Sequence, residues 1–488
     1  MKPEICRDKG PTRAGALLLT LVLLCALAAC QSQRPADRLA PPWNAASSRY
    51  NVRHFTESGG DAVFAAPAED AALSFEECVF TATQFAPDLV NSVIELELAE
   101  IGTADAFWKR FPKLNAWFRV VNNLTRHYDE YSDTTYRMGV GIHGFEPVVS
   151  FFESRSRELL EDIVYYTHQM AVEARARQIG GALLRLEYLE RVHALQGSRL
   201  VLAKQAVTYY RTQQESATDR LELAKATRQV AQAEVAMEKT ETFIAALMLN
   251  LKLMLGLDVD RALTVDAASL GRLLAADNAS GIFADNAWEE VWAADPEAAI
   301  VRLSRKLRDY DVEIAWSQYL PTVSMDMYTT NPKSDYAAPS SDDEVFFALQ
   351  FSIPLLDWGD RSRGVDKSVL RRVQEDQRGK LGRQRFAASW REDWQSLKLA
   401  RADEQLAAEA VAISKLDEQK AAIRQQTGQG SFGDLLEARV ALIESELALE
   451  EARLGVRSRE MADWFKAGHF RRRFFEPYKT HLEEGRES

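Results

Sequence analysis

The chain has 488 residues, with 60 Lys and Arg against 72 Asp and Glu, so its formal net charge is −12. Proteins that bind nucleic acid need a basic surface, so this charge balance argues against them. Gly and Pro are scarce, at 24 and 15 residues, and hydrophobic residues make up 46% of the chain. The composition therefore excludes collagen-like and disordered chains and leaves enough apolar residues for a large core.

The first 29 residues are typical of an export signal. Basic residues precede a run of small and apolar residues, 14–29, which is too short for a membrane-spanning helix. The run ends in Leu27-Ala28-Ala29-Cys30, which resembles the lipobox of bacterial lipoproteins, whose cysteine is lipidated and becomes the first mature residue. We predict a signal peptide over 1–29 and a lipid on Cys30. An ordinary secretory cleavage site is the alternative.

Two further features of this region bear on location. Gln31 follows the cysteine, and by resemblance to the lipoprotein sorting rule this favours the outer membrane. Residues 31–70 are rich in Pro, Ala and Ser without periodicity, so we predict a lipidated tether over 30–72.

Only Cys78 remains in the mature chain, so no disulfide is expected, and Cys78 is predicted to be a small buried hydrophobe.

Prolines reveal an internal duplication. Three of them recur at offsets of 209, 209 and 207 residues: Pro87, Pro112 and Pro147 correspond to Pro296, Pro321 and Pro354. Two halves of about 210 residues are too long for a solenoid unit. We predict a first structural repeat over 73–281, a second over 282–470, and a polar C-terminal tail over 471–488, in which the run Arg471-Arg472-Arg473 is solvated.

Each half is expected to begin with a helix, near 74–110 and 286–318, and to continue with two short strands. In the segment 345–353, apolar residues alternate with small or polar ones, and 136–143 shows the same pattern. A period of two fits a half-buried strand, and it also fits a strand of a membrane barrel with its apolar face outward. The predicted partners are 114–131 and 322–330, which gives one hairpin in each half.

Long helices should follow the strands, since no proline occurs over 148–295 or 355–476. Leu223, Val230 and Met237 begin a heptad series, and two seams run along the last long helix, one through Leu435 and Leu449, the other through Leu447, Leu454 and Met461. Two seams are typical of a helix in the wall of a tube, and a helix in an ordinary bundle is the alternative. The fold class is mainly α with a small β part, built from a duplicated unit of helix, β-hairpin and long helical hairpin.

Over residues 73–470 the sequence resembles the TolC-like outer-membrane efflux protein family, in its lipoprotein branch. The motifs that carry the resemblance are Tyr319-Leu320-Pro321, Phe351-Ser352-Ile353-Pro354-Leu355-Leu356-Asp357-Trp358-Gly359, and the segment 427–438, TGQGSFGDLLEA. The resemblance implies a homotrimer with a shared 12-stranded outer-membrane β-barrel, continued by a periplasmic α-helical coiled-coil tunnel. Independently of the family, four strands cannot close a barrel, so strands that span a membrane would need further copies of the chain.

The resemblance also implies which residues matter. Asp434 and Glu437 would line the periplasmic aperture, although an acidic residue at a helix start is a structural alternative for Asp434. Contacts with a periplasmic adaptor would lie at the tip, at Gly428, Gly430, Ser431, Ser216 and Asp219. Family members often carry a basic residue where this chain has Gly430, and the first-half tip lacks the family's glycine.

No pattern predicts an enzyme. The seven histidines show no metal-ligand spacing, and no nucleophile-elbow or phosphate-loop motif occurs, so we expect no cofactor and no metal. The expected function is an outer-membrane channel of a tripartite efflux system, with an adaptor and an inner-membrane transporter as partners. A type I protein-secretion duct is the first alternative, and a structural coiled-coil lipoprotein without a pore is the second.

The lipobox generates a direct test. Cys30→Ala should leave the precursor unlipidated, because the thiol that accepts the lipid is gone. Incorporation of labelled palmitate is the measurement, and incorporation that survives the substitution would refute the assignment. A barrel could still insert in the variant, since a lipid anchor and a barrel are separate membrane signals.

Overall fold

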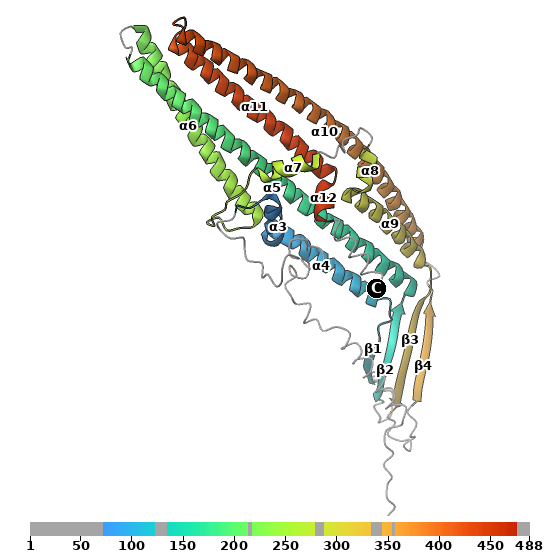
Figure 1. Cartoon of the computed structure of the whole chain (residues 1–488). Coiled ribbons are helices and arrows are strands. Elements are labelled where there is room, and N and C mark those ends of the chain that lie inside the picture. Colours follow the sequence, from blue (N-terminus) through green and yellow to red (C-terminus); the bar gives the residue numbers. More distant parts are fainter. Residues whose placement is uncertain are drawn as a thin grey trace, which may run out of the picture.

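The molecule is a long layer of helices with a small sheet at one end (Figure 1). The computed structural model describes residues 72–122, 134–212, 217–278, 287–332, 344–353 and 357–475. Several predictions therefore lie outside the described residues: the signal peptide and tether, Cys30, Ser216, and the side chain of Asp219.

The two halves of the chain have the same order of elements. In the first half these are α3 (Phe75–Phe85), α4 (Pro87–Trp108), β1 (Asn115–Asn122), β2 (Thr134–Phe145), α5 (Pro147–Thr212), α6 (Ala217–Leu255) and α7 (Ser269–Asn278). In the second half they are α8 (Trp288–Ala293), α9 (Pro296–Ser317), β3 (Thr322–Pro332), β4 (Glu344–Ser352), α10 (Asp360–Gln426), α11 (Phe432–Lys466) and the short α12 (His469–Phe474).

The first helix of each half is not continuous, so the expectation of single helices near 74–110 and 286–318 was wrong in this respect. Pro87 and Pro296 each occupy the first turn of a new helix, and the preceding Ala86 and Asp295 are extended, with ψ of 121° and 136°. A residue before proline avoids the α conformation, which ends the earlier helix there. Asp295 Oδ1 caps α9 by accepting a hydrogen bond from Glu297 N at 2.8 Å.

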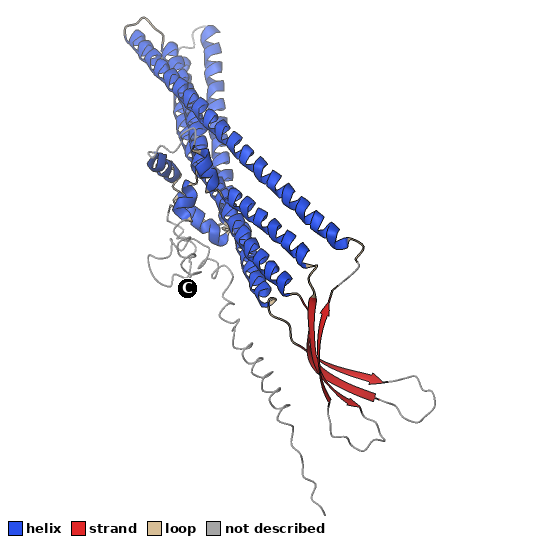
Figure 2. Cartoon of the chain, turned by 90° about the vertical axis from the view of Figure 1, so that its right-hand side faces the viewer, coloured by secondary structure: helices blue, strands red, loops and turns tan. Residues whose placement is uncertain are grey.

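The sheet confirms the two predicted hairpins. Its four strands are antiparallel in the order β1-β2-β3-β4, so the two hairpins join through β2 and β3 (Figure 2). One cross-strand row is Ala116, Val140, Met327 and Phe347, and the next is Trp117, Gly139, Tyr328 and Phe346. β1 and β4 lie at the edges, each paired along one side only within the described residues.

The two faces of the sheet differ in character. One face presents large apolar side chains to solvent, with Phe118 and Phe347 each 64% exposed and Phe351 61% exposed. On the other face small residues make room for aromatic ones, since a Cβ on Gly139 would come within 2.6 Å of Tyr328 Cβ. The alternation predicted from sequence is therefore present as two distinct faces.

The helices form a single layer whose order follows from their contacts. α5 packs on α4, where Ser92 Oγ and His168 Nδ1 are 2.8 Å apart, and on α9, where the rings of Phe152 and Tyr310 are 5.9 Å apart. α9 packs in turn on α10, as does α11. With α6 continuing α4 and α11 continuing α9 (Figure 1), the order across the layer is α4/α6, α5, α9/α11, α10.

Both seams of α11 are packed, as its heptads predict. Leu435, Leu449 and Val456 are buried on one seam, and Met461 is buried on the other. Val456 packs with Leu397 of α10, whereas Met461 joins the core that α5 shares. A helix with neighbours on both sides is thus confirmed for α11.

The two outer helices of the layer each have an apolar edge without a partner in the described chain. Along α10 the exposed residues are Leu370, Leu381, Leu399, Leu406, Ile413 and Ile423. Along α4 and α6, at the opposite edge, they are Leu98, Ile101, Leu221, Phe243 and Leu253.

No helix among the described residues is both long and apolar enough to cross a membrane.

The main core lies at mid-length, where the short helices cover one face of the layer. Phe75, Trp464, Phe465 and Phe470 are each at most 1% exposed there. Trp464 Nε1 donates to Asp277 Oδ2 at 2.9 Å, which ties α11 to α7. Cys78 belongs to this core, and burial raises the pKa of its thiol to about 12, as expected for an inert hydrophobe.

The arginine run at the end of the chain corrects another prediction. Arg471 is only 12% exposed, and its guanidinium donates to Glu173 Oε2 at 3.0 Å and to Asp295 Oδ2 at 2.8 Å. Arg473 pairs with Glu76 at 2.8 Å. Arg471 is therefore not solvated, because Phe470 and Phe474 enter the core on either side of it, whereas Arg472 and Arg473 are exposed. Residues 476–488 lie outside the described chain.

Asp463 gives the fold a pH dependence. It is 4% exposed on α11 and its Oδ2 has no hydrogen-bond partner among the described residues. Burial, with a smaller effect of Asp393, raises its pKa from 3.8 to about 6. The folded protein therefore keeps a proton that the unfolded chain releases between about pH 4 and 6, so Asp463 lowers stability as the pH rises through that window.

We expect Asp463→Asn to remove this loss. The melting temperature should rise relative to the wild type at about pH 7.5 and change little at about pH 4, where Asp463 is neutral in both states. Thermal unfolding followed by circular dichroism is the measurement. A shift of the same size at both pH values would contradict the raised pKa.

Candidate functional site

The end of the layer farthest from the sheet is formed by two helical hairpins, and we call it the tip (Figure 1). α10 turns into α11 through a glycine-rich segment in which Gly428 has φ of +75°, a conformation that glycine adopts without strain. The backbone N–H groups of Gln429 and Gly430 both donate to Arg424 O, at 2.8 and 3.0 Å. The turn therefore closes the end of α10 with backbone hydrogen bonds.

Ser431 and Asp434 form a capping box at the start of α11. Ser431 Oγ accepts a hydrogen bond from Asp434 N at 3.1 Å, and Asp434 Oδ2 accepts one from Ser431 N at 2.9 Å. These hydrogen bonds lower the pKa of Asp434, first through the backbone and then through the side chain of Ser431. The helix-start role foreseen for Asp434 is therefore present, and it keeps a negative charge at the tip.

The structure places Asp434 and Glu437 together on one exposed face of α11, as their spacing predicts. Burial raises the pKa of Tyr210, and three carboxylates add to this effect: Glu222 of α6, Asp434 and Glu437. The sequence reasoning missed Glu222. The internal repeat could have predicted it, because Asp219 and Glu222 have the same three-residue spacing as Asp434 and Glu437.

An aromatic contact holds the two hairpins together at the tip. The rings of Tyr209 and Phe432 are 4.5 Å apart, and a Cβ on Gly433 would lie 2.7 Å from Tyr210 Oη. Gly433 thus permits the close approach of α5 to α11. Of the predicted tip residues, the structure groups Gly428, Gly430 and Ser431 in one turn, and it does not describe the side chains of the first-half residues.

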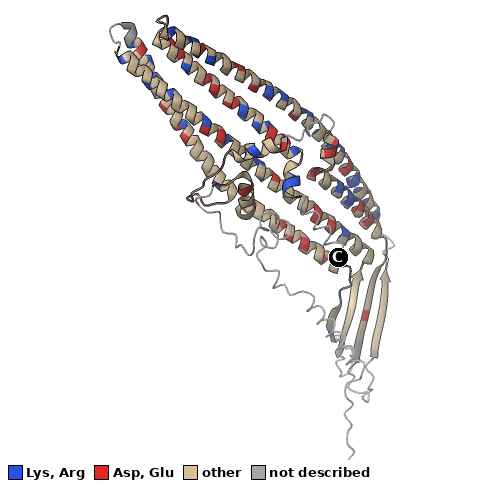
Figure 3. Ribbon diagram, in the orientation of Figure 1, with Lys and Arg blue, Asp and Glu red and all other residues tan. Residues whose placement is uncertain are grey.

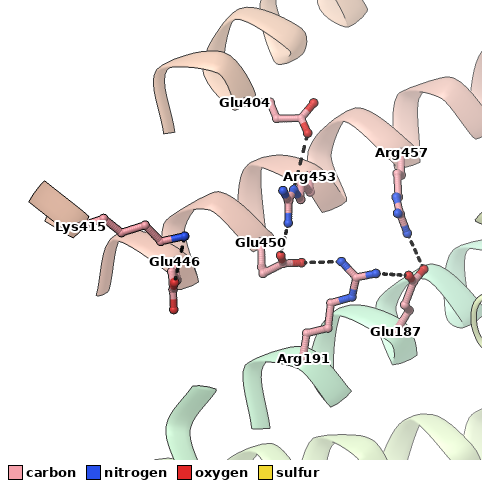
Figure 4. Close-up of polar contacts among 8 residues, drawn as sticks. All are labelled: Glu187, Arg191, Glu404, Lys415, Glu446, Glu450, Arg453 and Arg457. Atoms are coloured by element: carbon pink, nitrogen blue, oxygen red, sulfur yellow. Dashed lines mark hydrogen bonds and ion pairs between the residues drawn. The ribbon is translucent and has the colours of Figure 1, made fainter. Parts of the chain in front are cut away.

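A chain of ion pairs crosses the layer between the tip and the core (Figure 4). Glu187 on α5 accepts from Arg457 of α11 at 2.6 Å and from Arg191 at 2.7 Å. Arg191 also donates to Glu450 of α11 at 3.1 Å. Arg453 continues the chain from Glu450 to Glu404 of α10. Since Glu187 and Glu450 are only 11% and 13% exposed, these pairs join α5, α11 and α10 where water screens them least.

The face of the sheet opposite to Phe118 and Phe347 carries an aromatic row and a polar pair. Tyr328 stacks on Phe346 with ring centroids 5.3 Å apart and meets Trp117 at 5.9 Å. His143 Nε2 lies 3.5 Å from Asp326 Oδ1. No group of three or more His, Cys, Asp or Glu that could hold a metal occurs among the described residues.

Comparison with known proteins agrees with this architecture. Residues 289–462 match the family model described as "Outer membrane efflux protein". The resemblance to the outer membrane efflux proteins is confirmed. The match covers most of the second half of the chain, from α8 to α11, and a search of curated proteins finds no relative of the sequence.

Solved structures extend the likeness to both halves. The outer membrane protein VceC from Vibrio cholerae superposes with a TM-score of 0.66 at 15% identity, over 81% of this chain and 96% of that one. The CmeC outer membrane channel of Campylobacter jejuni gives 0.63 at 14%, over 87% and 94%. The open state of the MtrE outer membrane channel of Neisseria gonorrhoeae gives 0.63 at 15%, over 81% and 88%. At these identities the likeness establishes the fold shared with outer membrane efflux proteins.

Proposed function

We propose that the protein is the outer-membrane channel of a tripartite efflux system, in which three copies form one conduit. The observation that carries the proposal is the set of open edges on opposite sides of the molecule. β1 and β4 each lack a partner on their outer side within the described residues, and so do the apolar edges of α4/α6 and α10. Three copies of the sheet make a barrel of 12 strands, and the same rotation closes the helical layer into a tunnel.

The closure joins unlike edges, α10 of one copy to α4 and α6 of the next. A contact of this kind generates a ring when its rotation closes. It also satisfies the backbone groups of β1 and β4, which membrane lipid could not do. The helical edges gain burial of their exposed leucines and isoleucines at about 25 cal/mol per Å² of apolar surface.

The sheet end has the character of a membrane barrel. Its outer face exposes Phe118, Phe347 and Phe351, and the junctions between helices and strands expose aromatic rings: Trp108, Phe111, Trp316, Tyr319 and Trp358. Aromatic girdles of this kind mark the water interface of membrane barrels. We therefore place the sheet in the outer membrane, with the lipid on Cys30 as a second anchor, and the helices in the periplasm.

The tip would be the periplasmic entrance. In three copies, Asp434 and Glu437 bring about six carboxylates around one aperture, which gives a focused negative field. The turn with Gly428, Gly430 and Ser431, and its first-half counterpart with Ser216 and Asp219, would meet the periplasmic adaptor that connects the channel to an inner-membrane transporter. In this proposal the channel conducts passively, and the inner-membrane transporter supplies the driving force.

Two other functions compete with this one. A type I protein-secretion duct would use the same fold with another adaptor and pump, and the genes beside this one would distinguish the two. A structural coiled-coil lipoprotein would have no use for a sheet with an exposed apolar face, so the sheet favours a channel.

The sheet faces generate a matched pair of variants. Leu349 lies on the apolar face and Gln350 on the other, and Arg on a lipid-facing strand position near the bilayer midplane costs about 2–4 kcal/mol. Leu349→Arg should therefore lower the yield of detergent-stable trimers in the outer-membrane fraction much more than Gln350→Arg does. Equal yields would show that the faces are assigned wrongly.

The entrance is tested in planar bilayers. The wild-type trimer should conduct and should be blocked by a trivalent cation from the tip side. Asp434→Ala with Glu437→Ala should remove the block and the preference for cations while trimers remain, because the charges that attract the cation are gone.

A second double variant serves as the control for that recording. Glu392→Ala with Glu409→Ala removes the same charge from exposed positions on α10, away from the tip, and should leave the block intact. Unchanged block in the tip variant would place the entrance ring elsewhere. A preparation that yields only soluble monomers without conductance would end the channel proposal.

A further inference from the structure

α10 has a charge opposite to that of the chain. Residues 361–391, its half nearest the sheet, contain ten Lys and Arg against three Asp and Glu, whereas the whole chain has a net charge of −12. Figure 3 shows Lys and Arg gathered along this part of α10 beside α9. Two of them, Arg378 and Arg385, are exposed. Arg378 pairs only with Glu375 of the same helix, at 3.6 Å, and Arg385 forms no ion pair within the described part of the chain.

These two arginines lie between α8 and the free edge of α10. Gly382 stands about one turn after Arg378, and a Cβ on it would lie 3.7 Å from the ring of Trp292 of α8. Two intervals of seven residues lead from Arg385 to Leu399, which is 64% exposed on the apolar edge. Arg378 and Arg385 therefore continue this edge toward the sheet, on its α8 side.

The opposite edge of the layer is acidic. α4 contains five Asp and Glu and no Lys or Arg, and the segment 257–262, which follows α6, adds the exposed Asp258 and Asp260 against one Arg. Gly256 leads into this segment past the junction of α3 and α4, where a Cβ on it would clash with Phe85 O. Asp258 and Asp260 form no ion pair among the described residues. A basic edge and an acidic edge thus lie on opposite sides of one molecule.

The internal duplication relates the segment 257–262 to α12. Gly256 and Gly468 precede the two segments at an offset of 212 residues, and both have a positive φ, of 71° and 78°. In the second half, α12 crosses from the end of α11 onto α5, where Arg471 donates to Glu173 Oε2 at 3.0 Å. In the first half, the segment lies at the free edge of α4 and α6, beyond which the described chain has no further helix.

The same duplication identifies the positions on α10 that correspond to the place where α12 covers α5. The Arg-Ser-Arg triplets near the starts of α5 and α10 are 206 residues apart. At this offset Val172 corresponds to Arg378, and Ile179 corresponds to Arg385. Val172 and Ile179 are 1% and 0% exposed, in the core that α12 enters. Arginines therefore stand on α10 at the positions that a counterpart of α12 would cover.

The short helices support this offset. Gly180 of α5 lies against α3, since a Cβ on it would be 3.5 Å from the ring of Phe75. Its counterpart Phe386 lies against α8, with its ring centroid 5.1 Å from that of Trp292. Because α3 and α8 hold corresponding places in the two halves, α5 and α10 are matched in the structure as they are in the sequence.

We infer that Arg378 and Arg385 bind Asp258 and Asp260 of a second copy of this chain, whose segment 257–262 crosses onto α10 as α12 crosses onto α5. The inference rests on the proposed function, in which α10 of one copy meets α4 and α6 of the next. Guanidinium groups bind carboxylates in bidentate pairs. Two basic edges repel each other, and so do two acidic edges, so these charges select the unlike edges whose pairing closes a ring.

Charge reversal in the full-length chain, expressed in the outer membrane, tests the contact. Arg378→Glu with Arg385→Glu should lower the yield of detergent-stable trimers by roughly three- to tenfold, because like charges then meet at each interface. Asp258→Arg with Asp260→Arg should have the same effect. The four substitutions together should restore most of the wild-type yield, because the pairs form again with their signs exchanged. Native electrophoresis of detergent extracts is the measurement.

Lys380→Glu with Arg391→Glu is the matched control. Both residues are exposed, form no ion pair in the described chain and lie about 200° and 220° around α10 from Arg378. This variant makes the same change of charge and should keep the wild-type yield. An unchanged yield in the arginine variant, an equal loss in the control, or a fourfold variant no better than the double variants would each overturn the inference. A wild-type chain that forms no trimers is a different result, and it would contradict the proposed function.

Discussion

β1 and β4 each carry a row of backbone N–H and C=O groups that no described strand of the same chain pairs on its outer side. In water such edges invite association, and in lipid an unpaired peptide group costs several kcal/mol. The same two sides of the molecule expose the apolar seams of α4/α6 and α10. One arrangement of identical copies covers the sheet edges and the helical seams together, and the proposed conduit follows from it.

Two sets of contacts within one chain hold the helices of the layer together. The core of Phe75, Trp464 and Phe470 braces one face, and Arg471 ties the end of the chain to α5 and α9. The ion pairs from Glu187 to Glu404 cross three neighbouring helices nearer the tip, where the core has ended. An isolated exposed ion pair contributes little to stability. This chain of pairs contributes more, because the partly buried carboxylates of Glu187 and Glu450 are each shared between two arginines.

The sequence predicted the features that depend on local periodicity. The alternation at 345–353 gave β4 and its faces, and the two seams through Leu435 and Met461 placed α11 between neighbours. The helix break at Pro87 was missed although a proline often begins a helix, since the apolar pattern continues across it. The burial of Arg471 could not be read locally, because its partners Glu173 and Asp295 are far away in the chain.

The candidate site likewise has features that local spacing predicts and features that depend on how the helices pack. The spacing of Asp434 and Glu437 put both on one face, whereas the approach of Glu222 depends on how the two hairpins pack through Tyr209 and Phe432.

The pairing of unlike edges between copies is the central claim, and photo-cross-linking tests it most directly. Leu406 is 64% exposed on the free edge of α10, so benzoylphenylalanine placed there should react with residues of α6 in another chain. Mass spectrometry of membranes irradiated before extraction identifies the product. The account predicts a peptide from 217–255 linked between chains, in a ladder that ends at three chains. Products confined to one chain, or links from Leu406 to α10 of another copy, would contradict the closure on which the channel depends.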